Sequence, residues 1–390
     1  MNYDFNTIVD RSNGDSYKWN IEGSGSNLLP MWVADMDFRT APPIIDALFE
    51  RVRHGVFGYT SVGADYYTAV IDWFASNHGW KIDSSSIIYT SGVVPAVSAI
   101  IKAMTRPGDK IITQTPAYNC FFSSIRNNGC RLVPNTLVRN PHDGTYTIDF
   151  DELERLVSDP QAKLMILCNP HNPTGRVWTR DELMRVSEIC LRNGVFVISD
   201  EIHCELTFAG HRYTPFASLG PELAMNSAVC ISPSKAFNIA GLQIANIVAP
   251  NAEVYARIDR AINDNEVCDV NPFGVAATIA AYRNSALWLE ELKQYIYANY
   301  QYLVERLASV CPQYTVTPLE GTYLAWMSIE ASHLDAETFC NRLMEDTGLM
   351  LNPGTMYGHG GEHFVRINLA TQRSRIVDAV NRLTSFIESL

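Results

Sequence analysis

A lysine stands directly behind a predicted buried strand, with hydroxyl side chains just before it. The segment ISPSKAFNIAGLQ, residues 231–243, contains Lys235 together with Ser232 and Ser234. A lysine in such a place can form a Schiff base with an aldehyde, while the two hydroxyl groups bind a phosphate. The motif is weak when it is taken alone, because most loop lysines are simply exposed to solvent.

A carboxylate and an imidazole follow another predicted strand. Asp200 ends the run VFVISD, and His203 comes three residues later. Open α/β sheets bind ligands at the carboxyl ends of their strands, and an acid there can keep a pyridine nitrogen protonated. His203 is then placed to donate to a ring hydroxyl. The plainer alternatives are a helix cap or surface acid for Asp200 and a structural histidine for His203.

The segment CNPHNPTG, residues 168–175, is more specific. Two Asn–Pro steps and a Thr–Gly step after a buried strand dictate a rigid, non-helical loop. That loop fixes Asn172 at the edge of the sheet, where its amide can donate to a ring oxygen. A plain turn needs neither so much proline nor this location.

Further candidates follow other strand ends. Gly92, Val93 and Val94 open a helical pattern, and the free N–H groups of a helix start form an anion site; a turn-forming glycine is the alternative. Tyr118 can stack on a flat ring or pack as a core tyrosine. Arg366 lies in an apolar strand pattern and needs an anion, which is either an internal or a substrate carboxylate.

Together these residues match the needs of a site for pyridoxal 5'-phosphate (PLP). Such a site requires a Schiff-base lysine, an acid at the pyridine nitrogen, phosphate donors, a flat side chain and a cation for the substrate carboxylate. Each candidate lies at the end of a predicted strand, where one crevice would collect them. The sequence therefore predicts a PLP enzyme that acts on amino acids.

The middle of the chain alternates strand and helix patterns. Nearly continuous apolar runs predict strands buried on both faces, hence a parallel sheet covered by helices; these runs are residues 110–115, 131–134, 164–168, 195–199 and 228–232. Between two of them, Thr179 and Glu182 form a capping box, and Gly194 is a helix stop. These strand–helix–strand units predict right-handed crossovers.

The last hundred residues predict a smaller α+β domain. A long helical pattern over 287–310 leads into strand patterns at 322–327 and 363–369, and a final helix covers 374–390. We therefore predict a large PLP-binding α/β domain over residues 46–284. Residues 1–45 and 285–390 form the small α+β domain.

Composition and charge exclude several classes of protein. The chain has 390 residues, of which 47% are hydrophobic, and its net charge of −12 disfavours nucleic acid and anionic membranes as partners. No apolar stretch is long enough to span a bilayer, and the first residues lack a secretory pattern. Nine cysteines without a CxxC pair predict neither disulfides nor a metal site. We expect a cytoplasmic protein.

These motifs resemble those of the fold-type I PLP enzymes, the aspartate aminotransferase superfamily. NPHNPTG, SDEIH and SPSKAFNIAGLQ together are specific, and the likeness covers nearly the whole chain. Within the superfamily the chain is similar to the cystathionine β-lyase (cysteine C–S lyase) branch of the MalY/PatB type. That similarity lies in LPMWVADMDF (29–38), HGVFGYT (54–60), DEIHCEL (200–206), SKAFNIAGLQ (234–243) and GTYLAW (321–326).

The resemblance implies the aspartate aminotransferase-like fold and a role for each residue near the reacting atoms. Lys235 forms the Schiff base, and Arg366 with Asn172 binds the substrate α-carboxylate. Asp200 pairs with the pyridine nitrogen, while Asn172 and His203 lie near the ring oxygen. Tyr118 stacks on the ring.

The resemblance also implies a phosphate site. Its ligands are the amides of the helix start and hydroxyl groups from two segments: Gly92, Val93, Val94, Ser232, Ser234 and Tyr59. Tyr59 would reach the phosphate from the neighbouring subunit, which implies a homodimer. Gln243 departs from the pattern, because many aminotransferases have a phosphate-binding arginine at this position.

The implied reaction is α,β-elimination from L-cystathionine or other L-cysteine S-conjugates, which gives pyruvate, ammonia and a thiol. An aminotransferase would use the same lysine and carbanion, although Gln243 and the overall likeness favour the lyase. A regulatory or scaffold protein that retains the fold is a third alternative. A degenerate fold should have lost Lys235, Asp200 or Asn172, and the segment 4–30 is too short for an added DNA-binding domain.

Overall fold

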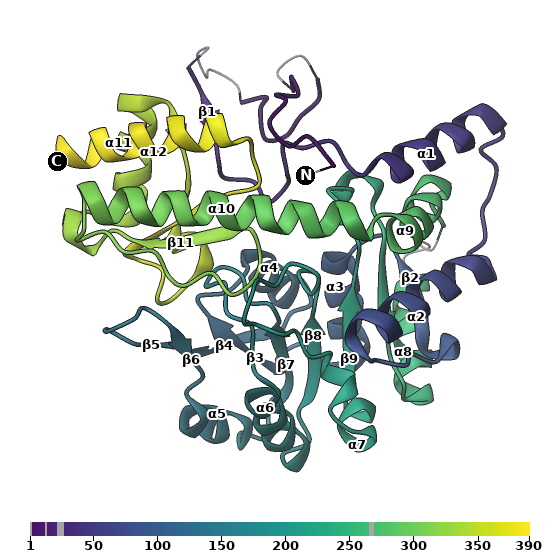
Figure 1. The fold of residues 1–390 in the computed structure, drawn as a ribbon. Helices are drawn as coiled ribbons and strands as arrows, with labels where there is room; N and C mark the ends of the chain where they lie inside the picture. The colour runs from purple at the N-terminus through teal and green to yellow at the C-terminus, as the bar shows by residue number, and fades with distance from the viewer. Residues whose placement is uncertain (1, 12–13, 22–26, 265–268) are drawn as a thin grey trace.

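A seven-stranded sheet forms the centre of the molecule in the computed structural model, which describes residues 2–11, 14–21, 27–264 and 269–390 (Figure 1). In spatial order its strands are β2 (Ile87–Thr90), β10 (Ala245–Val248), β9 (Ser227–Ile231), β8 (Phe196–Asp200), β7 (Ala162–Cys168), β3 (Lys110–Thr115) and β4 (Arg131–Thr136). Only β10 runs antiparallel to its neighbours in this sheet. The predicted mostly parallel sheet is confirmed.

The apolar strands are buried because helices cover both faces of the sheet. Along β7, Leu164 and Ile166 pack into one hydrophobic cluster, whereas Met165 and Leu167 pack into the other. Since successive strand residues point to opposite faces, an uninterrupted apolar run suits a strand in this central position.

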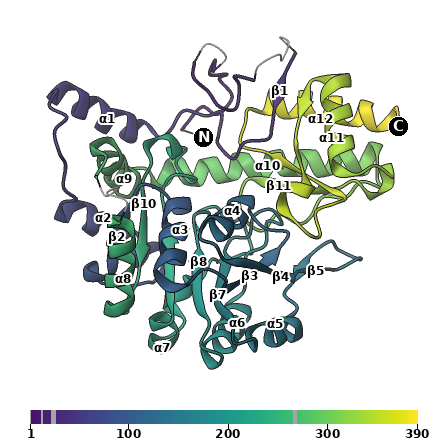
Figure 2. The same cartoon turned by 180° about the vertical axis from the view of Figure 1, so that it is seen from behind.

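Helices from separate parts of the chain cover each face (Figures 1 and 2). One cluster contains α3 (Val93–Met104), α4 (Asn119–Asn127) and α8 (Ala252–Asn263). The larger cluster contains α2 (Ala64–His78), α5 (Phe150–Val157), α6 (Arg180–Arg192), α7 (Pro221–Met225) and α9 (Pro272–Asn284), the last of which packs against α1 (Pro42–His54).

Helix α6 begins and ends as its sequence predicts. The Thr179 hydroxyl accepts a hydrogen bond from the Glu182 amide at 3.2 Å, and the Glu182 carboxylate accepts one from the Thr179 amide at 2.8 Å. Gly194 follows the helix with φ +66°, a conformation that glycine adopts without a steric cost. The predicted capping box is therefore confirmed.

The C-terminal part of the chain builds a second, smaller sheet. The 25-residue helix α10 (Ala286–Val310) leads to an antiparallel sheet of β11 (Leu324–Ser328), β14 (Phe364–Asn368) and β13 (Asn352–Pro353). Helices α11 (Ala336–Thr347) and α12 (Arg373–Glu388) cover it. A small hairpin of β5 (Val138–Arg139) and β6 (Tyr146–Thr147) contacts this sheet through Tyr146, whose hydroxyl accepts from Trp326 Nε1 at 3.1 Å.

The N-terminal segment joins this C-terminal part. Strand β1 (Leu29–Pro30) pairs in parallel with β12 (Leu349–Met350), more than 300 residues away in sequence. The predicted domain boundaries at residues 45 and 284 stay predictions, although α9 ends at Asn284 and α10 begins at Ala286.

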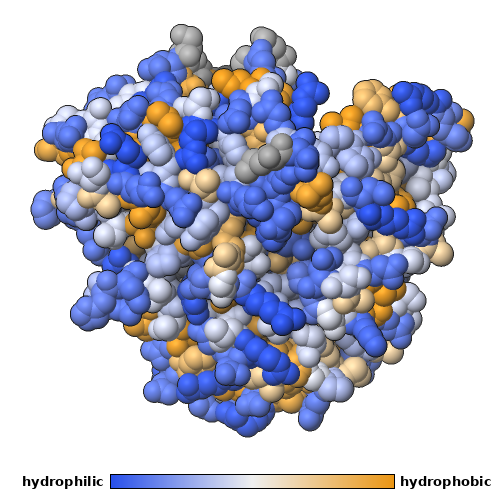
Figure 3. Space-filling view, viewed as in Figure 1, coloured by the Kyte–Doolittle hydropathy of each residue, from blue (hydrophilic) through white to orange (hydrophobic). Residues whose placement is uncertain are grey.

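The surface carries no large apolar belt on the face seen in Figure 3, where hydrophobic residues form small groups among hydrophilic ones. Within the described ranges, no helix has both the length and the apolar composition that crossing a membrane requires.

Candidate active site

A cavity of about 190 Å³ lies at the carboxyl ends of the central strands. Most of the predicted site residues line it: Gly92, Val93, Val94, Tyr118, Asn172, Asp200, His203, Ser234 and Lys235. They follow the ends of β2, β3, β7, β8 and β9. Parallel strands present their carboxyl ends at one edge, which is why segments spread over 140 residues meet at one place.

Lys235 points into this cavity, where its amine is hydrogen-bonded to the Ala34 carbonyl. Lys235 Nζ donates to Ala34 O at 2.6 Å. The pKa of Lys235 is lowered to about 8, chiefly by burial and in addition by the Arg366 cation, while Asp35 and Asp200 act in the opposite direction. A neutral fraction of the amine therefore exists near neutral pH, and this fraction can act as a nucleophile or a base.

Asp200 is the last residue of β8 and is 3% exposed. Burial raises its pKa to about 7, against the opposing effects of a hydrogen bond from the Ile202 amide at 3.1 Å and the Lys235 charge. A cation placed beside such a buried carboxyl group would keep it ionised.

His203 lines the same cavity and is neutral. Burial lowers its pKa well below the ordinary value, and the Lys235 and Arg366 charges act in the same direction. Within the part of the chain that the structure describes, His203 Nδ1 is buried without a hydrogen-bond partner. A ligand oxygen would satisfy this nitrogen, since buried polar atoms nearly always have a partner.

Asn172 and Arg366 form a pair beside the cavity. Arg366 Nη1 donates to Asn172 Oδ1 at 3.1 Å, and Nη2 donates to Trp32 O at 2.8 Å. The guanidinium is 4% exposed, and among the described residues its Nε has no partner. The structure thus shows an amide, a carbonyl and the face of the Tyr357 ring as its partners, and the charge is left for the carboxylate of a ligand.

Helix α3 supplies amide groups to the opposite wall. It begins at Val93 after the N-cap residue Gly92, and Val93 and Val94 both line the cavity. The first amides of a helix have no intrahelical acceptor, so they can bind an anion such as a phosphate.

Comparison with known proteins places the chain in a family. The model of the family described as aminotransferase class I and II matches residues 31–383. The chain belongs to this family. It is 40% identical to cystathionine beta-lyase PatB of Bacillus subtilis (strain 168), over 98% of this chain and 99% of that protein. It is 33% identical to protein MalY of Escherichia coli (strain K12), over the whole of both chains.

A solved structure shows that the similarity to this family includes the fold. Cystalysin from Treponema denticola, whose crystal structure contains a pyridoxal 5'-phosphate cofactor, superimposes with a TM-score of 0.96. The two chains are 34% identical, and each is covered completely. The predicted family resemblance and the predicted fold class are confirmed.

The residues that line the cavity fit PLP. The pyridinium cation would remove the cost of ionising Asp200, and a ring oxygen would satisfy His203 Nδ1. Lys235 is the amine that would bind the aldehyde. The α3 amides and the Ser234 hydroxyl stand where they would bind the phosphate.

Two predicted phosphate ligands do not line this cavity. The Ser232 hydroxyl donates to Ile244 O at 2.6 Å and accepts from the Ser234 amide at 3.1 Å, so it supports the turn before Lys235. Tyr59 lies between α1 and α2 and is 100% exposed. Their roles at the phosphate stay predictions.

Ala34 lines the cavity and accepts the Lys235 hydrogen bond, and it was not among the predicted site residues. Its functional group is a backbone carbonyl, so its side-chain type carries no signal. Only the motif LPMWVADMDF, which contributed to the resemblance, pointed to this segment.

Proposed function

We propose that the chain is a PLP-dependent carbon–sulfur lyase. It carries out α,β-elimination on L-cystathionine or other L-cysteine S-conjugates and releases pyruvate, ammonia and a thiol. The convergence of Lys235, Asp200 and Asn172 around one cavity, with Arg366 hydrogen-bonded to Asn172, supports this proposal in a chain that is 40% identical to a cystathionine beta-lyase.

Substrate binding begins at Arg366. Its guanidinium takes the α-carboxylate of the amino acid, and the free Nε supplies a donor for that bond. Asn172 Oδ1 accepts from Nη1 and holds the planar group in its orientation. The α-carbon is thereby placed near the Lys235 amine.

Proton transfer then depends on Lys235 and Asp200. PLP, when it is bound, supplies the electron sink that stabilises negative charge on the α-carbon. Lys235 Nζ removes the Cα proton in its neutral form, which its pKa of about 8 makes accessible. Asp200 would hold the ring nitrogen of the bound cofactor protonated. A thiolate leaves from Cβ, and the released aminoacrylate hydrolyses to pyruvate and ammonia.

An aminotransferase is the second candidate. The family description names that reaction, and the same lysine and cation would serve it. Gln243 favours the lyase, because it replaces the phosphate-binding arginine that many aminotransferases have at this position. The complete set of Lys235, Asp200 and Asn172 disfavours a purely regulatory or scaffold protein.

We also propose a cytoplasmic homodimer in which Tyr59 of each subunit reaches the phosphate site of the other. The exposure of Tyr59 and of the neighbouring Val56 and Phe57 supports this arrangement, since apolar groups on a surface segment mark contact sites. We expect amino acids as substrates, with neither nucleic acid nor membrane as a partner.

The proposal is tested with the purified protein, PLP and L-cystathionine. Pyruvate formation without an added 2-oxo acid, and with a retained visible cofactor band, supports elimination. Conversion of that band to a stable amine form without pyruvate supports an aminotransferase instead.

Lys235→Ala should abolish pyruvate formation, because the Schiff-base amine and the base are the same group. Lys81→Ala, which removes an exposed lysine, is the matched control and should keep wild-type activity. Substantial elimination by Lys235→Ala would contradict the assignment.

A further inference from the structure

Residues 31–38 form a strap along the cavity, and side chains from distant elements hold its backbone. Asn368 Nδ2 donates to the carbonyl oxygens of Val33 and Asp35, and Asn238 Nδ2 donates to that of Met36 at 3.0 Å. Ala34 lies between the two carbonyls that Asn368 holds. Its own carbonyl is therefore fixed in position at the cavity wall.

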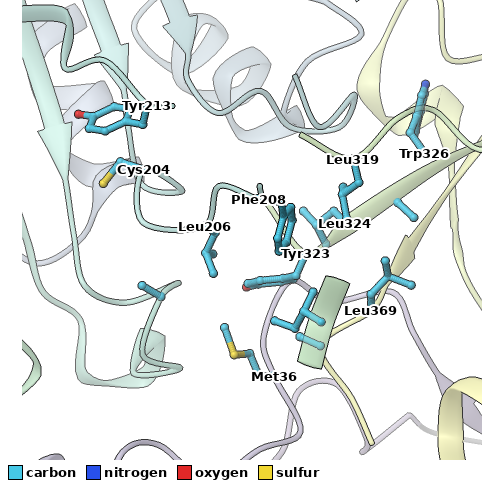
Figure 4. Close-up of a cluster of buried hydrophobic side chains, with 14 of the residues drawn as sticks. Met36, Cys204, Leu206, Phe208, Tyr213, Leu319, Tyr323, Leu324, Trp326 and Leu369 are labelled. Atoms are coloured by element: carbon cyan, nitrogen blue, oxygen red, sulfur yellow. The ribbon is translucent and has the colours of Figure 1, made fainter. Parts of the chain in front are cut away.

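The Ala34 carbonyl accepts two hydrogen bonds at once. Lys235 Nζ donates to it at 2.6 Å, and the Tyr323 hydroxyl donates to it at 2.8 Å. Tyr323 is fully buried, and its ring meets His203 edge-on with centroids 5.9 Å apart. Figure 4 draws Tyr323 in the cluster of buried side chains that also holds Met36 of the strap.

Tyr323 can only act as the donor in this pair. Burial raises the pKa of its phenol far above the ordinary value, so the hydroxyl keeps its proton at every pH at which the protein would work. The Ala34 oxygen has no proton to give. One of its lone pairs is thus permanently shared with Tyr323.

The backbone before Tyr323 is unusual as well. Thr322 has φ +68°, a left-handed conformation that a β-branched residue rarely adopts. Its amide donates to Leu206 O at 2.7 Å, which holds the turn in place. Strained residues of this kind gather at functional sites, and this one directly precedes Tyr323 in the chain.

We propose that Tyr323 is a positioning residue that acts on Lys235 through the Ala34 carbonyl. By donating to this oxygen, Tyr323 weakens the hydrogen bond that the oxygen accepts from the protonated lysine. A larger fraction of Lys235 is then neutral at a given pH, and the neutral amine is the form that takes the Cα proton. This inference rests on the proposed function only in giving Lys235 the role of a base.

Other titratable groups also lie close enough to Lys235 to interact with it electrostatically. They are Arg366 of β14, Asp200 of β8, His203 after β8, Asp35 of the strap and Cys120 of α4. None of them changes when the Tyr323 hydroxyl alone is removed. A change in the titration of Lys235 in such a variant therefore reports the lost donor.

The test is Tyr323→Phe, which keeps the buried ring and deletes one hydroxyl. In cofactor-free protein, labelling of Lys235 by acetic anhydride is followed against pH by mass spectrometry. We expect its midpoint to rise by about half a pH unit, because the freed lone pair favours the charged amine. In the holoenzyme, the acid limb of the plot of kcat against pH for L-cystathionine should also move to higher pH, and KM should be unchanged.

Tyr300→Phe is the matched control. The Tyr300 hydroxyl donates to the Thr317 carbonyl at 3.2 Å, so this variant loses the same kind of hydrogen bond away from the cavity. It should leave the labelling midpoint unchanged. An unchanged or lowered midpoint in Tyr323→Phe, or a uniform loss of kcat at every pH, would show that Tyr323 only packs.

The labelling experiment separates this inference from the proposed function. A protein that produced no pyruvate would overturn the lyase proposal. The midpoint shift in cofactor-free protein would still support the link from Tyr323 to Lys235, since it needs no reaction.

Discussion

Asp200 shows how a single buried residue can lower the stability of the folded protein until its ligand binds. Its carboxyl group lies at the end of a strand inside the sheet, and burial raises its pKa from the ordinary 3.8 to about 7. The unfolded chain ionises this group at a lower pH than the folded, cofactor-free protein does. Its contribution to stability is therefore complete below pH 3.8 and is lost as the pH rises through 7.

Asp200→Asn should make the cofactor-free protein more stable at pH 8, because the amide carries no charge to bury. We expect a gain of about 1–4 kcal/mol in the free energy of unfolding at pH 8, and almost none at pH 4. Urea unfolding at the two pH values measures this difference. Added PLP should stabilise the wild type more than the variant, and equal unfolding curves at pH 8 would contradict the argument.

Single residues at strand ends were predictable, because their chemistry and their position coincide. Asp200, Asn172 and Lys235 each follow an apolar run that could be read from the sequence, and all three line one cavity. Ala34 could not be found in that way, since its role belongs to a backbone carbonyl. Tyr323 entered the prediction only as part of the motif GTYLAW. Its hydrogen bond to the strap joins residues 289 positions apart, which no local pattern can indicate.

Among the elements, the loop after β7 and the turn before β11 pack directly on each other. Gly321 lies where they meet, and its amide donates to Gly175 O at 2.8 Å. A Cβ atom at Gly321 would come within 2.9 Å of side-chain atoms of Pro170 and Val177. Both neighbours are short and rigid, so neither can move away cheaply.

Gly321→Ala should therefore weaken both the fold and the site. We expect a loss of about 1–3 kcal/mol in the free energy of unfolding, together with a lower kcat, because Tyr323 and the Asn172 loop shift. Urea unfolding and the pyruvate assay measure the two effects. Gly241→Ala is the control, since Gly241 is exposed and a Cβ there meets nothing within 4 Å. Wild-type stability of Gly321→Ala would contradict this packing argument.

Elements were predictable where one pattern dominates. The helix at 287–310 and the strand at 110–115 match α10 and β3 closely, because their periodicity is long or their apolar run is continuous. Strand β10 was not predicted. It is four residues long, follows a stretch of loop and runs antiparallel between β2 and β9. Its apolar run is therefore too short to indicate a strand by itself, and no crossover helix precedes it.

At the scale of the whole molecule, α1 packs on α9 and projects at the periphery in both ribbon views (Figures 1 and 2). Large hydrophobic side chains are exposed along it and in the segment that follows: Phe49, Val52, Val56, Phe57 and Tyr59. Exposed apolar groups gathered on a projecting segment favour contact with another chain. A second copy of the same chain would bury them through a two-fold interface.

If this contact brings Tyr59 to the partner's phosphate site, two defective chains should restore each other. Tyr59→Ala should lower the affinity for PLP by about tenfold, since a hydrogen bond to a charged group is lost. Lys235→Ala should be inactive. A mixed dimer has one intact site, made of Lys235 from one chain and Tyr59 from the other.

Equal amounts of the two variants, unfolded and refolded together, should recover about a quarter of the wild-type activity at limiting PLP, because half of the dimers are mixed and each has one good site. Refolding each variant alone gives the background. Activity no higher than the mean of the two backgrounds would mean that Tyr59 serves its own chain or no site at all. The dimer itself is checked separately by light scattering, so that loss of assembly is not mistaken for loss of the shared tyrosine.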